Sequence, residues 1–145
     1  PRKFKTAITG SRTLDVVHEI IEDWQRQTGI EAALTTVEVV DADPAVTVQL
    51  AAALQEMLHN VAKHAEAARV EVTLTDLEGQ LELTVRDDGI GFDTARARRL
   101  ESVGHYGLRG LRERAAQVGG ALQIDSVRGE GTTIRWTAVR QPMPA

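Results

Sequence analysis

The chain contains no cysteine, and only 3% of its 145 residues are aromatic. The lack of cysteine excludes disulfides and thiolate metal sites and is typical of a reducing compartment. No apolar run is long enough to cross a bilayer, and no secretory signal is present. We therefore expect a cytoplasmic domain, whether or not a parent protein is anchored in the inner membrane.

Excess positive charge is also missing, because the formal net charge is -4. Such a chain offers no broad basic surface to nucleic acid or to an anionic membrane, so we expect no nucleic-acid partner. A polyanionic ligand would need a local positive site instead.

What is present is typical of one globular domain: 42% of the residues are hydrophobic and 26% are charged. We place this domain at residues 13–139. The first residue is Pro1 rather than Met, so we expect a fragment of a longer protein, with residues 1–12 as an interdomain or cloning-derived segment. Residues 140–145, which include two prolines, are expected to form a flexible tail.

Hydrophobic spacing predicts three helices and five strands. The helices are expected at 13–29, 45–65 and 108–118, and the strands at 31–40, 70–74, 81–85, 122–124 and 134–138. Glu78-Gly79 is typical of a hairpin turn between the second and third strands. Because helices and strands do not alternate regularly, we predict a two-layer α/β sandwich with a mixed, mainly antiparallel sheet and the helices on one face.

The helix predicted at 45–65 carries four polar side chains that helical spacing places on one face, turned away from its apolar stripe. They are Glu56, Asn60, Lys63 and His64. An amide oxygen is a hard ligand suited to Mg²⁺, and an ammonium one turn further along could neutralise a phosphate. A solvated helix face is the alternative interpretation.

Asp87, Gly89 and Gly91 follow directly on a predicted strand. A carboxylate there can accept a hydrogen bond from an exocyclic amine such as that of adenine, while glycines let the backbone approach a flat base. An ordinary Asp-Gly turn is the alternative.

Two further glycine-containing segments are less specific. Gly104 and Gly107 lead into the third predicted helix, whose free backbone N–H groups would form a phosphate site, although a surface loop would look the same. Gly131 and Thr132 lie between the last two strands, where a glycine turn is common in any protein.

The order and spacing of these segments together resemble the catalytic domain of bacterial sensor histidine kinases. The run 56–65 (EMLHNVAKHA) resembles their N-box, and the runs 85–92, 104–114 and 129–132 resemble their glycine boxes. The second glycine box is most similar to the subfamily linked to NarL-type response regulators. The resemblance implies the ATP-binding Bergerat fold, which gyrase B, MutL and a heat-shock chaperone share.

For the N-box, the resemblance implies roles at the phosphates. Asn60 would coordinate the Mg²⁺ that bridges them, with Lys63 and His64 nearby. Glu56 would act catalytically, by orienting or activating the attacking histidine.

For the glycine boxes, the resemblance implies roles around the nucleotide. Asp87 would bind the adenine amine, with Gly89 and Gly91 shaping the pocket. Gly104 and Gly107 would be the two hinges of a lid, and Leu108, the first residue of the third helix, would also bind ATP. Gly131 and Thr132 would border the adenine pocket from the side of the sheet. The lid would span about residues 93–106.

The implied function is transfer of the γ-phosphate of ATP to a histidine on a separate dimerisation domain, followed by relay to a response regulator. The isolated domain is then expected to be monomeric and not to autophosphorylate alone, while the parent protein would be a homodimer. The alternatives are an anti-sigma-factor serine kinase of the same superfamily and a non-catalytic nucleotide-binding docking module.

Overall fold

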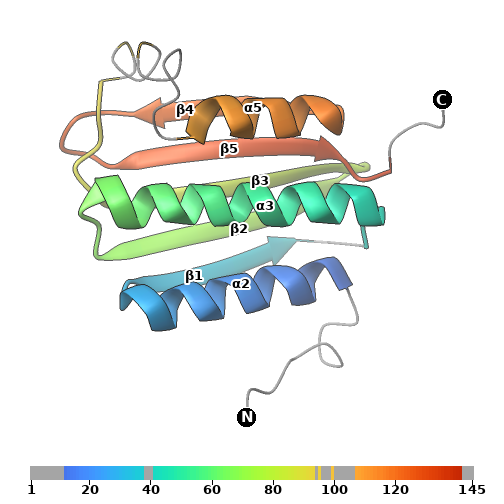
Figure 1. Ribbon diagram of the computed structural model, residues 1–145, viewed down its shortest axis with the longest axis horizontal. Helices are drawn as coiled ribbons and strands as arrows, with labels where there is room; N and C mark the ends of the chain where they lie inside the picture. The colour runs from blue at the N-terminus through green and yellow to red at the C-terminus, as the bar shows by residue number, and fades with distance from the viewer. Residues whose placement is uncertain (1–11, 38–40, 94, 96–98, 100–106, 142–145) are drawn as a thin grey trace.

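The computed structural model describes residues 12–37, 41–93, 95, 99 and 107–141, which form two layers (Figure 1). In chain order the elements are α2 (Arg12–Thr28), β1 (Glu31–Val37), α3 (Pro44–Asn60), η1 (Val61–Ala65), β2 (Arg69–Leu77), β3 (Gln80–Asp87), α5 (Leu108–Gln117), β4 (Leu122–Ser126) and β5 (Thr132–Val139). Among these residues no helix is long and apolar enough to cross a membrane.

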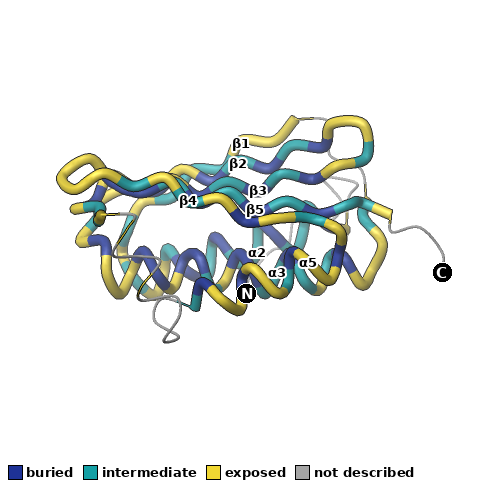
Figure 2. Tube along the Cα trace, turned by 90° about the horizontal axis from the view of Figure 1, so that it is seen from above, coloured by how far each residue is buried: buried dark blue, intermediate teal, exposed yellow. Residues whose placement is uncertain are grey.

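The five strands form one mixed sheet in the order β1-β2-β3-β5-β4. β1 is parallel to β2, and the other three pairings are antiparallel. Helices α2, α3 and α5 all lie on one face, and the other face is open (Figure 2). The predicted fold class is therefore confirmed.

The core lies between these layers because β2, β3, β4 and β5 alternate more buried with more exposed side chains. Val70, Val72 and Leu74 of β2 face the helices and are fully or almost fully buried. The few aromatic residues include Trp136, which is completely buried and whose Nε1–H donates to the carbonyl of Leu111 at 3.1 Å. The Trp136 indole thus joins α5 to the sheet within a mainly aliphatic core.

Local signals fix the ends of the central elements. Asp43 caps α3, since its carboxylate accepts from the amide of Ala45 at 3.1 Å, and Pro44 occupies the first turn. The predicted hairpin turn between β2 and β3 is present, with positive φ at Glu78 (53°) and Gly79 (85°).

The second predicted helix differs from expectation at its C-terminal end. The α-helix stops at Asn60, and the last five residues, Val61–Ala65, form a π-helical turn. A π turn holds more residues per turn than an α-helix and often occurs at functional sites. It changes the direction of the side chains that follow Asn60.

Candidate functional site

Three polar side chains form a row across the end of the sheet on its helix-covered face. Asp87 is the last residue of β3 and pairs directly with Thr132, the first residue of β5. Thr132 also pairs with Ser126, the last residue of β4. Because directly paired residues point to the same face, the three side chains are neighbours.

The Asp87 carboxylate is buried, with 7% of the residue exposed. It accepts hydrogen bonds from the backbone amides of Gly89, at 2.8 Å, and Thr132. Burial raises the pKa of Asp87 above its usual range, and Asp88 adds to the rise, while the two amide donors oppose it. The site thus holds a buried acceptor whose charged form is costly.

A small cavity lies above this row, between the end of the sheet and the residues of η1 and α5. Its polar lining residues are Asn60, His64, Asp87 and Thr132, and its apolar walls are Val61, Ala65, Phe92, Leu108 and Ile134. Apolar walls with a few convergent polar groups are typical of small-molecule sites. The cavity volume is about 30 Å³, far below the roughly 150 Å³ that accommodates benzene. A flat ring can enter only if side chains at the mouth move.

The π turn is joined to the loop after β3. The amide of Ile90 donates to the carbonyl of Ala65 at 2.8 Å. A Cβ added to Gly89 would lie 2.7 Å from the Ala65 carbonyl carbon, closer than real side chains come. Gly89 is therefore needed for the contact that places η1 beside Asp87.

The other glycines of these segments make equally close contacts. A Cβ at Gly91 would fall 2.9 Å from the carbonyl oxygen of Gly131, and one at Gly131 would overlap the backbone of Asp87. Gly131 also has a φ of +88°, which disfavours other residues. These glycines let the β3 loop and the β4–β5 turn pack tightly around the carboxylate.

The predicted polar face of the second helix is divided in the structure. Asn60 is buried and lines the cavity, so its placement on a face turned away from the apolar stripe was wrong. Glu56 is half-buried, and Lys63 and His64 are exposed. His64 reaches the rim of the cavity, whereas Lys63 is not among the residues that line it.

Glu56 lies against the start of α5. A Cβ at Gly107 would be 2.6 Å from Glu56 Cδ, and Gly107 has a φ of +64°. Leu108, the first residue of α5, is buried and lines the cavity. The residues 94, 96–98 and 100–106 lie outside the described part of the chain, and with them Gly104 and most of the predicted lid.

Sequence reasoning missed Ser126 and the apolar walls other than Leu108, which was among the predicted ATP-binding residues. Ser126 could have been found by continuing the alternation of Leu122 and Ile124 by two residues, which places it on the same face. The walls could not, because Val61, Ala65 and Ile134 read only as ordinary core residues.

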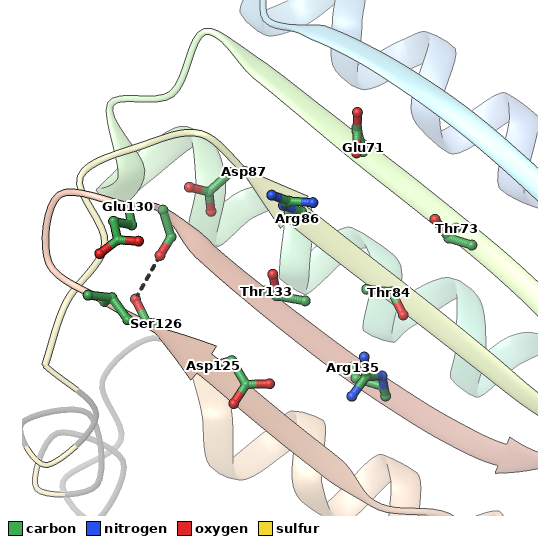
Figure 3. A pocket seen from close by; sticks show the side chains of 12 residues that line it. Glu71, Thr73, Thr84, Arg86, Asp87, Asp125, Ser126, Glu130, Thr133 and Arg135 are labelled. Atoms are coloured by element: carbon green, nitrogen blue, oxygen red, sulfur yellow. Dashed lines mark hydrogen bonds between the residues drawn. The ribbon is translucent and has the colours of Figure 1, made fainter.

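Two other hollows are larger than this cavity. One, of about 520 Å³, lies on the open face of the sheet, carries acidic and basic side chains such as Glu71 and Arg86, and also borders Asp87 and Gly131 (Figure 3). The hydrogen bond drawn there ends on Ser126, at the border between the two faces. The other, of about 580 Å³, lies between α2 and α3 and contains none of the predicted site residues.

Comparison with known proteins matches residues 45–142 to the family of histidine kinase-, DNA gyrase B- and HSP90-like ATPases. Sensor histidine kinase YdfH of Bacillus subtilis is 42% identical over 83 residues, which are 57% of this chain and 20% of the relative. Nitrate/nitrite sensor protein NarQ of Escherichia coli is 29% identical over 133 residues, 90% of this chain and 23% of the relative. The chain thus spans about a fifth of these relatives' length.

Solved structures with the same fold include two histidine kinase domains. That of the blue-light activated histidine kinase of Erythrobacter litoralis has a TM-score of 0.73 at 20% identity, over 88% of this chain and 60% of the other. The catalytic domain of histidine kinase ThkA has a TM-score of 0.70 at 15% identity, over 89% of this chain and 92% of the other. At these identities the likeness shows the fold.

Proposed function

Because the chain belongs to the family of histidine kinase-, DNA gyrase B- and HSP90-like ATPases, we propose that it is the catalytic domain that supplies the γ-phosphate of ATP in a two-component sensor histidine kinase. The observation that carries the proposal is the buried Asp87 carboxylate below an apolar cavity. Relatives such as YdfH and NarQ support the kinase type.

Adenine fits this cavity chemically. Its flat ring would pack between Ala65, Phe92 and Ile134, and its exocyclic amine would donate to Asp87. Gly89 and Gly91 would keep the loop beside the ring free of side chains, and Thr132 would border the ring from the sheet. Since the cavity is narrow, access requires Phe92, Leu108 or His64 to move.

The triphosphate would extend from the cavity toward Asn60, His64 and Lys63. Gly107 precedes α5, whose first backbone N–H groups form an anion site together with the helix dipole. Gly104 would be the second hinge of a lid over the phosphates. These parts position and neutralise the phosphates, which is most of what phosphoryl transfer needs.

Magnesium fits the donor set. In the described part of the chain, no three His, Cys, Asp or Glu side chains gather into a metal site. Mg²⁺ commonly takes only one or two protein ligands when it binds with substrate phosphates, and the Asn60 amide oxygen at the cavity is such a ligand. When bound, Mg²⁺ would neutralise charge on the phosphates.

Glu56 would orient or activate the attacking histidine, because it lies beside Gly107 at the phosphate end. That histidine belongs to a dimerisation domain of the parent protein, and the phosphate would pass on to a response regulator. We propose that the isolated domain is a monomer that does not autophosphorylate, and that it works on the cytoplasmic side, where ATP is available.

The experiment is phosphotransfer with the parent's histidine-bearing domain supplied in trans. We expect an acid-labile phosphohistidine with ATP and Mg²⁺, and about a hundredfold less of it for Glu56→Gln, consistent with loss of one catalytic base or orienting group. Asp125→Asn, which changes an exposed carboxylate on the open sheet face, should leave the yield unchanged. ATP hydrolysis without phosphohistidine would instead indicate another activity of the superfamily.

A further inference from the structure

Ser126 makes three hydrogen bonds through one hydroxyl group. Its Oγ accepts from the amide of Phe92 at 2.8 Å, donates to the carbonyl of Gly131 at 3.2 Å, and lies 2.8 Å from Thr132 Oγ1. These partners come from the loop after β3, the β4–β5 turn and the first residue of β5. Ser126 therefore links the apolar wall of the cavity to its polar floor.

The chemistry of the partners fixes where each proton lies. The Phe92 amide can only donate, and the Gly131 carbonyl can only accept. Because Ser126 has one hydroxyl proton and gives it to Gly131, the proton between Ser126 and Thr132 must come from Thr132. This arrangement satisfies all three contacts of Ser126, whereas the reverse leaves the Gly131 carbonyl with the longer bond from the Val127 amide, at 3.4 Å, in place of the Ser126 proton.

The Thr132 hydroxyl consequently has no proton left for the cavity and offers it only lone pairs. Asp87, its direct neighbour across the β3–β5 pair, also offers only an acceptor when ionised. The floor of the cavity thus presents two hydrogen-bond acceptors side by side. A ligand group with protons to donate is favoured there, and a carbonyl is repelled.

We propose that Ser126 is a positioning residue that makes the pocket selective for 6-amino purines over 6-oxo purines, by holding the Thr132 proton away from the ligand. The inference rests on the proposed nucleotide function. It assigns to Ser126 a role in discrimination, separate from the role that its bond to Phe92 plays in shaping the wall.

The test compares the dissociation constants of ADP and inosine diphosphate, whose bases differ at the 6-position and in the N1 proton that goes with the 6-oxo group. For the wild-type protein we expect ADP to bind at least about a hundredfold more tightly, as for sites built around a hydrogen-bonding group. Ser126→Ala frees the Thr132 proton to turn toward a 6-oxo group. The ratio of the two constants should then fall by about five- to tenfold, the worth of about one hydrogen bond.

Two controls distinguish a positioning role of Ser126 from a purely structural role. Ser126→Thr keeps the hydroxyl and should keep the ratio. In a Thr132→Val background, Ser126→Ala should leave the ratio unchanged, because Ser126 acts through Thr132. A purely structural role would weaken both nucleotides equally in Ser126→Ala.

The outcomes distinguish this inference from the function on which it rests. If the wild-type protein binds neither nucleotide, the proposed function fails. If it prefers ADP and Ser126→Ala leaves that preference intact, the nucleotide function stands and the role of Ser126 is overturned. A fall in the ratio for Ser126→Ala that also occurs in the Thr132→Val background would overturn it as well.

Discussion

Gly89 packs directly on the backbone of Ala65, so that the loop after β3 and the π turn after α3 touch without an intervening side chain. The amide of the next residue, Ile90, adds a hydrogen bond to this contact by donating to the Ala65 carbonyl at 2.8 Å. The contact sets the width of the cavity, because Asp87 precedes the loop and His64 precedes Ala65. The placement of one side of the cavity relative to the other depends on it.

Replacing Gly89 by alanine should therefore move the loop after β3 away from the π turn. The added Cβ would meet backbone, which cannot rotate away, so we expect a loss of about 1–3 kcal/mol in unfolding free energy and a marked loss of ATP affinity. Urea unfolding and nucleotide titration measure the two effects.

The matched control is Gly110→Ala. Gly110 is exposed within α5, and a Cβ there has nothing within 4 Å. Alanine should stabilise the helix by about 0.5–1 kcal/mol and leave ATP affinity unchanged. Equal destabilisation by both substitutions would contradict the contact argument.

The raised pKa of Asp87 predicts how stability depends on pH. Because the pKa of Asp87 is higher in the folded state, the ionised carboxylate costs stability at neutral pH. The protonated Asp87 side chain contributes stability in full at pH values below its pKa in the unfolded chain. This contribution is lost as the pH rises through its pKa in the folded protein. The neutral variant Asp87→Asn avoids this loss, so its stability relative to wild type should be greatest at neutral pH and shrink on acidification.

Urea unfolding of both proteins at several pH values, from acidic to neutral, checks this prediction. The test depends on how the stability difference between the two proteins changes with pH, rather than on its size at one pH. The Asp87→Asn substitution would alter the bonds to Gly89 and Thr132 at every pH. A stability difference that grows on acidification would mean that the pKa shift has the opposite sign.

A partly buried ion pair far from the cavity supports the sheet. Arg140 Nη1 lies 2.6 Å from Asp76 Oδ2, and only 2% of the Asp76 side chain is exposed. Arg140→Met would leave the buried carboxylate without its guanidinium, and we expect a loss of about 3 kcal/mol in unfolding free energy. Chemical denaturation measures it.

Adding Asp76→Asn to Arg140→Met removes the buried charge and should recover part of that loss. Nucleotide affinity should not change in either variant, because the pair lies at the opposite end of β2 from the cavity. An unchanged denaturation midpoint for Arg140→Met would show that the pair contributes nothing to stability.

The fold could be predicted from sequence where periodicity is strict. Val70 to Leu74 and Leu81 to Val85 alternate, and Glu78-Gly79 supplies the turn between them, so the hairpin follows from local preferences. The spacing of Leu50, Leu54 and Leu58 likewise predicts α3, because the core needs one apolar stripe.

The cavity could be predicted only in part. The π turn at Val61–Ala65 leaves no signature in hydrophobic spacing. Asn60 precedes this turn, and its direction was misjudged because the buried face of α3 is wider than the predicted stripe and also includes Ala53. Ser126 acts through a carbonyl, an amide and a hydroxyl from three separate segments. Such a constellation depends on the tertiary fold, which local sequence patterns do not report.

The central claim is that Asp87 recognises adenine, and titration calorimetry with ATP and Mg²⁺ tests it most directly. We predict saturable binding to the wild-type protein and to the Asp125→Asn control, and loss of binding in Asp87→Asn with the fold verified by circular dichroism. Equal ATP affinity in Asp87→Asn and wild type would contradict the claim.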